Sequence, residues 1–568
     1  MADPAAPAPS MRETGKDPAE RHGAPGRPGG RRRALALSLT LALGFAAVSG
    51  QLVRLAAIGQ MASLNNEVRA IGRGIARPDI VDRAGRLLAT DIVLPSLFAD
   101  PSRIIDLDDA VERLSEALPD LDPAGLRRDL SDRERRFVWL ERGMHPDEAQ
   151  KVLELGIPGL AFREELRRVY PGGDGTGNLL GYVDIDNRGR AGLERYVDGQ
   201  DLVDLVDGPT RSERPPVVAS IDLAAQHILD SELTAAVRRY DAESAAGLVM
   251  DVRTGEIIAA VSLPAYPAGD AAATLEPRHL DRLLIGTYEL GSVFKTLTFA
   301  NAFDLGTARP DKIYDATEPL KVGRFTIDDF HGRHRPLTAE EVFIFSSNIG
   351  TARMASEIGA ERQQAFLDRL GLLAPLPTEL GEGAPPQRPE TWSEASMLTV
   401  SFGHGLAVTP LSFAAAVASI VNGGRRITPT FLKVAPGSAH GEAPPDQVVT
   451  PATARLMRDL LRANVAKPGG TGGRAAVPGY RVGGKTGTAD IAGKGGYVGS
   501  DVLTSFVAVF PTDEPRYLSL VLLWKPKGTN GTGDQTAAGH NAAPTTARII
   551  TRIAPLLGLE PDYRDPGM

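Results

Sequence analysis

The stretch "YELGSVFKTLT", residues 288–298, places a serine three residues before a lysine. On a helix, positions i and i+3 share a face, so the Ser292 hydroxyl and the Lys295 amine can touch. Gly291 permits a sharp backbone turn, and the free N–H groups of a first helical turn can stabilise a developing oxyanion. Of the eleven lysines, only Lys295 has a serine at this spacing. The pattern indicates either a serine nucleophile with its own base or a solvated helix face.

A lysine works as a base at neutral pH only if burial or a second cation lowers its pKa. The stretch "GGKTGTAD", residues 483–490, supplies Lys485, Thr486, Gly487 and Thr488. We expect a strand at a sheet edge here, where Gly487 lets an extended substrate backbone lie close. A glycine-rich turn is the alternative.

A third motif, "FSSNIG", contains Ser346 and Asn348. The hydroxyl can relay a proton, and the amide can bind a substrate carbonyl or orient Lys295. A helix cap is the alternative, because S-x-N also occurs as "SLN" at 63–65. The order is more specific than any single motif: S-x-x-K, then S-x-N about 50 residues on, then K-T-G about 140 further, matches a known catalytic constellation.

The N-terminal region predicts a membrane anchor. Residues 1–33 are rich in Pro, Gly, Ala and charge, and we expect a disordered cytoplasmic tail that ends in "RRR". Residues 34–53 carry no charge and, at about 1.5 Å each, span roughly 30 Å of hydrocarbon. The arginines should stay cytoplasmic, which places the rest of the chain outside. A cleaved signal peptide is the alternative.

Composition excludes some functional classes. The net charge of −8 argues against a general nucleic-acid binder. The absence of cysteine excludes disulfides and thiolate sites. His331, His334 and His404 have spacings that fit no zinc motif, and we interpret them as structural or solvent-facing.

Two folded regions are expected beyond the anchor. Residues 54–216 read as a mixed pedestal domain, and residues 217–560 as an α+β domain. The predicted helices and strands follow from apolar periodicity. We expect strands within 79–92, 245–262, 503–510 and 516–524, helices within 106–118, 122–131, 220–240 and 409–424, and surface loops at 380–389 and 527–540.

With these motifs assembled, the chain resembles a class B penicillin-binding protein, the monofunctional transpeptidase type. "YELGSVFK" is similar to the family's Y-E-P-G-S-x-F-K, with Leu290 in place of proline, and "GGKTGTAD" fits without change. "SFGHGLAVTPLSF" resembles the G-Y-G-Q-G…T-P-L-Q segment, with Phe402, His404 and Ser412 as departures. Upstream, "RPDIVDRAGRLLA" resembles a pedestal motif with Pro78 in place of glycine, as do "LRRVYPGG" and "RAGLERYVDG". The resemblance covers roughly residues 70–550 and is strongest for the division-specific FtsI type.

The resemblance implies an anchored protein of the cell inner membrane with an elongated pedestal and a periplasmic penicillin-binding domain. That domain is expected to have a mainly antiparallel sheet flanked by helices. Its substrates would be peptidoglycan stem peptides ending in D-Ala-D-Ala, and β-lactams would acylate the same serine. No metal or cofactor is expected. The expected partners are an FtsW-type glycosyltransferase and other division proteins, and no nucleic acid.

The resemblance also implies residue roles. Ser292 would be the nucleophile, Lys295 its base and Ser346 a proton relay. Asn348 would hold Lys295 and substrate, and Lys485 would supply a positive field. The hydroxyls of Thr486 and Thr488 would bind the substrate carboxylate beside Gly487, and the N–H groups of Ser292 and Thr488 would form an oxyanion hole. The alternatives are an elongation-specific enzyme of the same class, a β-lactam-hydrolysing relative and a β-lactam sensor.

Overall fold

The computed structural model describes residues 73–323, 325–435, 446–493 and 496–564. The predicted tail, the predicted anchor and the first part of the predicted pedestal lie outside these residues. Within the described ranges, none of the helices combines the length and the apolar character that a membrane span requires. Arg73–Met568 form one compact unit, and the fold below is the fold of that unit.

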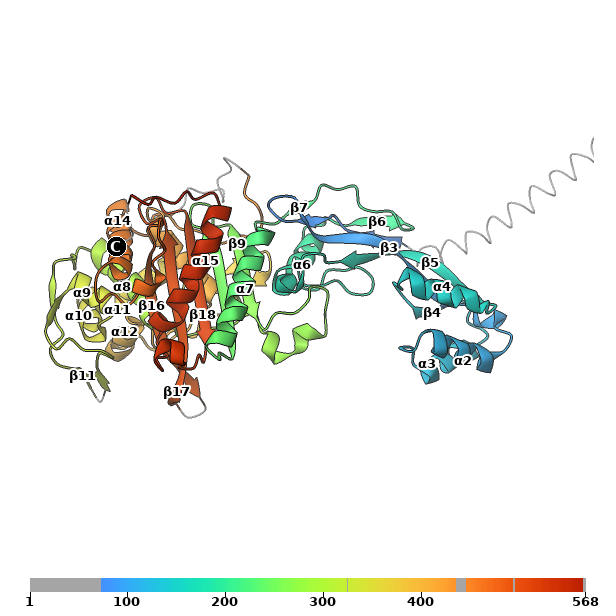
Figure 1. Ribbon diagram of the computed structural model, residues 1–568, viewed down its shortest axis with the longest axis horizontal. Helices are drawn as coiled ribbons and strands as arrows, with labels where there is room; N and C mark the ends of the chain where they lie inside the picture. The colour runs from blue at the N-terminus through green and yellow to red at the C-terminus, as the bar shows by residue number, and fades with distance from the viewer. Residues whose placement is uncertain (1–72, 324, 436–445, 494–495, 565–568) are drawn as a thin grey trace, which may run out of the picture. The chain divides into compact units, whose positions relative to one another are not determined.

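A long central strand organises the pedestal (Figure 1). This strand, β3, pairs antiparallel with β5, β4 and β2, while β1 pairs with β6. The predicted strands within 79–92 are confirmed as β2 and β3, joined by a turn at Gly85, whose φ is +86°. The pedestal strands are β1 (Arg73–Ala76), β2 (Ile80–Val81), β3 (Leu87–Ala99), β4 (Val138–Glu141), β5 (Leu160–Val169), β6 (Asp204–Asp207) and β7 (Val217–Val218).

Capped helices cover one end of this sheet. The predicted helices are confirmed as α2 (Leu107–Ala117) and α3 (Pro123–Ser131), whose N-caps are Asp106 and Asp122. Each cap carboxylate accepts two backbone N–H groups that the first helical turn leaves unpaired. Together with α4 (Pro146–Leu155), these helices and the end of β3 enclose a small apolar core.

A buried ionic network ties the pedestal segments together. Glu194, in α6 (Gly192–Gly199), accepts Arg77 Nε and Arg168 Nε, each at 2.7 Å. Asp91 accepts the Arg77 backbone N–H at 2.8 Å and Arg168 Nη1 at 3.3 Å. All four side chains are buried. Arg77, Arg168 and Glu194 come from the three pedestal segments that resemble the family. These segments are therefore joined by buried charges that must compensate one another.

The second domain is built on a five-stranded sheet in the order β16-β17-β18-β8-β9, and every pair is antiparallel. This confirms the expected α+β class with an antiparallel sheet. The three strand regions predicted in this domain from apolar periodicity are present: 245–262 forms the β8–β9 hairpin, and 503–510 and 516–524 form parts of β17 and β18. The strands are β8 (Ser244–Asp251), β9 (Ile257–Leu263), β16 (Gly483–Gly493), β17 (Gly496–Phe510) and β18 (Tyr517–Trp524).

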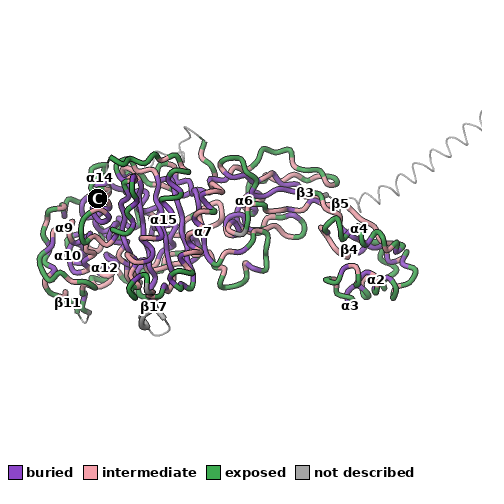
Figure 2. The backbone as a smooth tube through the Cα atoms, in the orientation of Figure 1, coloured by how far each residue is buried: buried purple, intermediate pink, exposed green. Residues whose placement is uncertain are grey.

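Helices cover both faces of the sheet, so β8 is buried along its whole length. Figure 2 shows that much of the backbone around α15 is buried. The predicted helices within 220–240 and 409–424 are confirmed as α7 (Leu223–Arg239), capped by Asp222, and α13 (Pro410–Val421). Figure 1 shows α7 and α15 (Ala542–Leu556) lying side by side across one face. On the other face α13 packs with α8 (Lys295–Asp304) and α14 (Pro451–Ala466).

Two loops contain short elements that the sequence did not reveal. The start of the stretch 380–389 belongs to a hairpin between β14 (Pro377–Thr378) and β15 (Gly381–Glu382), because Gly381 takes φ +126° there. The stretch 527–540 contains two short 3-10 turns, Asn530–Thr532 and Ala538–His540.

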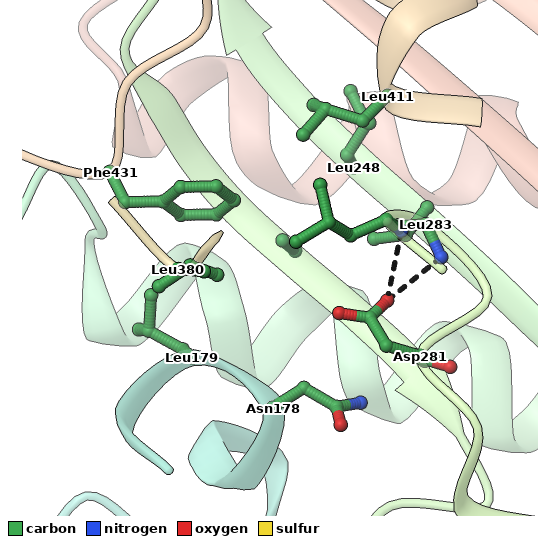
Figure 3. A pocket seen from close by; sticks show the side chains of 11 residues that line it. Asn178, Leu179, Leu248, Asp281, Leu283, Leu380, Leu411 and Phe431 are labelled. Atoms are coloured by element: carbon green, nitrogen blue, oxygen red, sulfur yellow. Dashed lines mark hydrogen bonds between the residues drawn. The ribbon is translucent and has the colours of Figure 1, made fainter. Parts of the chain in front are cut away.

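Pedestal residues also pack on the sheet of the second domain. Figure 3 shows Leu179, from α5 (Gly177–Leu180), facing Leu380, Phe431 and the β8 residue Leu248 around a small apolar cavity. The Asp281 carboxylate at its rim accepts the N–H groups of Leu283 and Leu284, at 2.9 and 3.2 Å. Burial raises the pKa of Asp281.

Candidate active site

The nucleophile candidate lies on a tight turn. Gly291 has φ +62° and begins a 3-10 turn, Gly291–Phe294, that carries Ser292 and leads directly into α8. Lys295 is the first residue of α8. Ser292 therefore precedes the α-helix, whereas the sequence allowed a place within the first helical turn. The 3-10 turn still brings Lys295 Nζ to 2.9 Å from Ser292 Oγ.

Lys295 is completely buried and surrounded by oxygen atoms. Its amine lies 2.8 Å from the Ser346 carbonyl oxygen, 3.2 Å from Ser346 Oγ and 2.7 Å from Asn348 Oδ1. Burial lowers the pKa of Lys295 to about 7, with the charge of Asp329 acting in the opposite direction. The side chain can therefore exchange a proton near neutral pH.

The S-x-N motif sits at the start of α10 (Asn348–Ile358). Ser347 is the N-cap, and Ser346, just before it, has φ +61°, a left-handed conformation that is uncommon for a residue with a side chain. The stretch therefore caps a helix, as one interpretation predicted. Ser346 and Asn348 also contact Lys295, as the catalytic interpretation requires. Ser346 and Asn348 are half-buried, whereas Lys295, which both contact, is completely buried.

The second lysine comes from β16, which occupies the edge of the sheet as the sequence predicted. Lys485 Nζ lies 3.0 Å from Ser346 Oγ, the hydroxyl that Lys295 also contacts. Burial, together with the charge on Lys295, holds the pKa of Lys485 well below its ordinary range. Two amines thus flank one hydroxyl, and simultaneous protonation of both is disfavoured.

Missing side chains let β16 approach the nucleophile turn. A methyl group at Gly291 would lie 2.5 Å from the Thr488 carbonyl oxygen, and one at Gly487 would lie 2.4 Å from the Leu290 carbonyl oxygen. Both distances are far below van der Waals contact, so only glycine fits at either position. The backbone of Thr488 is thereby held against the residue that precedes Ser292.

The two motif threonines have different surroundings. The Thr486 hydroxyl is buried and donates to Thr471 Oγ1 at 2.7 Å, which in turn donates to Asn464 Oδ1 at 3.1 Å. Thr488 is half-buried, and its Oγ1 accepts the Ala538 N–H at 3.2 Å, so its own proton remains available to a ligand. In the free protein Thr488 is the better placed of the two to donate to a carboxylate.

Sequence reasoning missed Asn464 and Thr471. Asn464 is completely buried in α14, and its Nδ2 donates to the Gly484 carbonyl at 2.7 Å, which fixes β16 just before Lys485. Thr471 lies in the glycine-rich stretch "KPGGTGG" at 467–473. No helix was predicted over residues 451–466, so no signal in the sequence singled out either residue.

The histidines do not assemble a metal site. Across the described part of the chain, no group of three or more potential ligands is close enough to hold a metal ion. His404 is half-buried, and burial lowers its pKa, with Glu289, Lys295 and Asp490 as its charged neighbours.

The comparisons with known proteins agree with this geometry. Residues 245–551 match the model of the penicillin binding protein transpeptidase domain, and residues 74–202 match that of the penicillin-binding protein dimerisation domain. The chain is 38% identical over 493 residues to a probable peptidoglycan D,D-transpeptidase FtsI of Caulobacter vibrioides, covering 85% of this chain and 82% of that protein.

The chain is a class B penicillin-binding protein. This penicillin-binding protein is also 29% identical over 536 residues to the peptidoglycan D,D-transpeptidase FtsI of Escherichia coli, covering 90% of this chain and 88% of that one. Among solved structures it resembles the transpeptidase domain of Burkholderia pseudomallei penicillin-binding protein 3. That match has a TM-score of 0.53 and 29% identity, and covers 62% of this chain and 99% of the other.

Proposed function

We propose that this penicillin-binding protein is a serine-type peptidoglycan D,D-transpeptidase. It crosslinks stem peptides that end in D-Ala-D-Ala during septal wall synthesis in cell division, and β-lactams acylate it covalently. The observation that carries the proposal is the buried Lys295 amine, 2.9 Å from the Ser292 hydroxyl.

The hydrogen bonds around Lys295 favour its role as a base. A neutral amine has two N–H groups and one lone pair. Asn348 Oδ1, at 2.7 Å, and the Ser346 carbonyl, at 2.8 Å, can only accept, so they take the two N–H groups. The lone pair is then left for a hydroxyl proton, and Ser292 is the closest hydroxyl.

Acylation begins when Ser292 Oγ attacks the carbonyl carbon of the penultimate D-Ala and its proton passes to Lys295. The C–N bond to the last D-Ala breaks, and Ser346 passes a proton from the lysine pair to the leaving amine. The N–H groups of Ser292 and Thr488 hold the developing oxyanion, and one such donor is typically worth about 3 kcal/mol of barrier.

The remaining residues bind and orient the donor peptide. The extended peptide lies along the edge of β16. The absence of a side chain at Gly487 admits the Leu290 carbonyl of the nucleophile turn, which holds this edge beside Ser292. Lys485 supplies positive field, Asn348 holds the substrate amide, and Thr488, with Thr486 after rotation of its hydroxyl, binds the terminal carboxylate. An amine from a second strand then attacks the ester, forms the crosslink and returns the proton to Ser292.

Labelling with fluorescent penicillin tests the nucleophile. Wild-type protein should become covalently labelled and release D-Ala from a D-Ala-D-Ala peptide, and Ser292→Ala should do neither. Ser356→Ala, in the body of α10, is a matched control that should keep both activities. Covalent label on Ser292→Ala would refute the assignment.

Two alternatives share the same acyl-enzyme. Rapid turnover of penicillin, instead of a long-lived adduct, would identify a β-lactam-hydrolysing relative. A wall peptide that does not react would identify a sensor.

Depletion of the protein followed by microscopy separates a role in division from one in elongation, because filaments indicate the former and rounded cells the latter. The FtsI names of the relatives favour division.

The proposed location is the cell inner membrane, with one N-terminal anchor at 34–53 and a periplasmic catalytic domain. Its uncharged length and the arginines before it support this topology. The proposed partners are an FtsW-type glycosyltransferase, which would supply the glycan strands, and other division proteins. Co-purification of the full-length chain with such a polymerase tests the partnership.

A further inference from the structure

Asp329 lies in the loop between β12 (Phe325–Ile327) and β13 (Pro336–Thr338) and binds the start of α10. One carboxylate oxygen accepts the backbone N–H groups of Asn348 and Ile349, at 2.5 and 3.0 Å. The other accepts the Ser347 hydroxyl at 2.7 Å. The carboxylate therefore satisfies donors that a helix N-terminus leaves unpaired, where the helix dipole favours a negative charge.

The same loop also orients the Asn348 side chain. Asn348 Nδ2 donates to the Asp328 carbonyl at 3.0 Å, which turns Oδ1 toward Lys295 Nζ, 2.7 Å away. The backbone of Asn348 is fixed by Asp329 and its amide by Asp328. A shift of this loop would move an oxygen that holds the amine beside Ser292.

We propose that Asp329 is a positioning residue of the transpeptidation reaction, which fixes the start of α10 so that Asn348 and Ser346 hold the Lys295 amine against Ser292. The inference rests on the proposed function. Asp329 lies outside the three sequence motifs and acts through one of them, because it accepts hydrogen bonds from residues 347–349.

The charge of Asp329 gives the role a distinctive signature. Three charged or titratable groups interact electrostatically with Lys295. They are Asp329 from its loop, Lys485 from β16 and His404 from the loop after α12 (Glu394–Val400). Asp329 raises the pKa of Lys295, against the effect of burial. Removing this charge should therefore lower the pKa of Lys295, so that its amine loses the proton at a lower pH.

The test compares full-length variants in rates of acylation by fluorescent penicillin across pH. Asp329→Asn keeps the size but loses the charge and one acceptor. We expect acylation about 10- to 100-fold slower at the optimum, as small displacements of catalytic groups commonly produce. We also expect the acidic limb of the pH profile to move to lower pH. Asp329→Glu keeps the charge and should keep the limb near its wild-type position.

Controls separate positioning from folding. Ser347→Ala removes one of the three hydrogen bonds to Asp329, together with the cap bond to the Gly350 N–H, and leaves the charge unchanged. It should therefore slow acylation less and leave the limb in place. Asp311→Asn removes an exposed carboxylate paired with Arg309 and should change neither quantity. Thermal melts of each variant, made on the same samples, report the folded fraction by which each rate is corrected.

The outcomes are distinguishable. An Asp329→Asn protein with the wild-type rate overturns the inference, and so does one that is slower with an unmoved limb, because that result reports only structural damage. Failure of wild type to be acylated, or labelling of Ser292→Ala, would instead refute the proposed function on which the inference rests.

Discussion

The Cα of Gly291 faces the carbonyl of Thr488 so closely that a methyl group on it would lie 2.5 Å from that oxygen. The contact joins the turn before Ser292 to the strand that carries Lys485. Two segments almost 200 residues apart are thus held in register by the absence of one side chain. The relative position of nucleophile and substrate strand depends on this backbone contact.

Gly291→Ala should therefore nearly abolish acylation. The methyl group must push β16 away from the nucleophile turn, which we expect to lower the rate by about 100-fold or more. Gly306→Ala is a matched control, because Gly306 has a similar φ of +70° but nothing within 4 Å of the added methyl. It should lose about 1 kcal/mol of stability through backbone strain and acylate normally. Equal rates for the two variants, measured with fluorescent penicillin, would contradict the contact argument.

The rate of acylation should rise with pH through an apparent pKa near 7. Lys295 must lose its proton to act as a base, and its pKa is about 7. The rate should therefore increase by roughly tenfold between about pH 6 and pH 8. A flat profile measured over this range by stopped-flow labelling would exclude Lys295 as the titrating base.

The free energy of unfolding should depend on pH, because Lys295 has different pKa values in the folded and the unfolded chain. The folded pKa of Lys295 lies below its ordinary value of 10.5, so the unfolded chain binds the proton more tightly between about pH 7 and 10.5. The contribution of Lys295 to the free energy of unfolding should rise with pH across this window and level off below about pH 7. Comparing urea midpoints of wild type and Lys295→Met across pH isolates it, and equal pH dependence in both proteins would speak against it.

Lys295→Arg should remove acylation at every accessible pH. A guanidinium stays protonated, so it cannot accept the Ser292 proton, and loss of a general base typically costs 100- to 10,000-fold, approximately. Lys312→Arg is the control, because Lys312 is a half-exposed lysine paired with Glu357 and should tolerate the change. Recovery of the Lys295→Arg rate at high pH would show that another group is the base.

Glu194→Gln should destabilise the pedestal. Glu194 is completely buried between Arg77 and Arg168, so removing its charge leaves two guanidinium groups poorly compensated, at a cost of about 3–5 kcal/mol. Asp109→Asn, in an exposed pair with Arg113, should cost less than about 0.5 kcal/mol. Thermal unfolding followed by limited proteolysis of the pedestal measures both. Similar melting temperatures for the two variants would mean that the buried network is not needed for stability.

The sequence could predict what is local. Helix α7 and its cap Asp222 follow from periodicity and a capping carboxylate, and β16 follows from a short run of glycine and threonine beside apolar strands. The three motifs could be assembled because their order matches a known constellation. Asp329 could not be found in this way, because its importance arises from a loop that folds back on a helix N-terminus about 20 residues later.

Other residues eluded the sequence for the same physical reason. Asn464 looks like any polar residue in a helix until α14 packs on β16 and its amide meets the Gly484 carbonyl. His404 was interpreted as structural or solvent-facing; it is half-buried, and the charges of Glu289, Lys295 and Asp490 act on its pKa. Side chains whose roles depend on distant neighbours leave no periodic trace.

Because β16 pairs with only one neighbouring strand among the described residues, an extended ligand could add to its other edge as a further strand. A mimic of this further strand, with an acidic terminus and no strained ring, would bind the edge of β16 through main-chain hydrogen bonds and the Thr488 hydroxyl. Such an inhibitor would not need to react with the serine, so drug resistance that acts by slowing covalent capture would leave it effective.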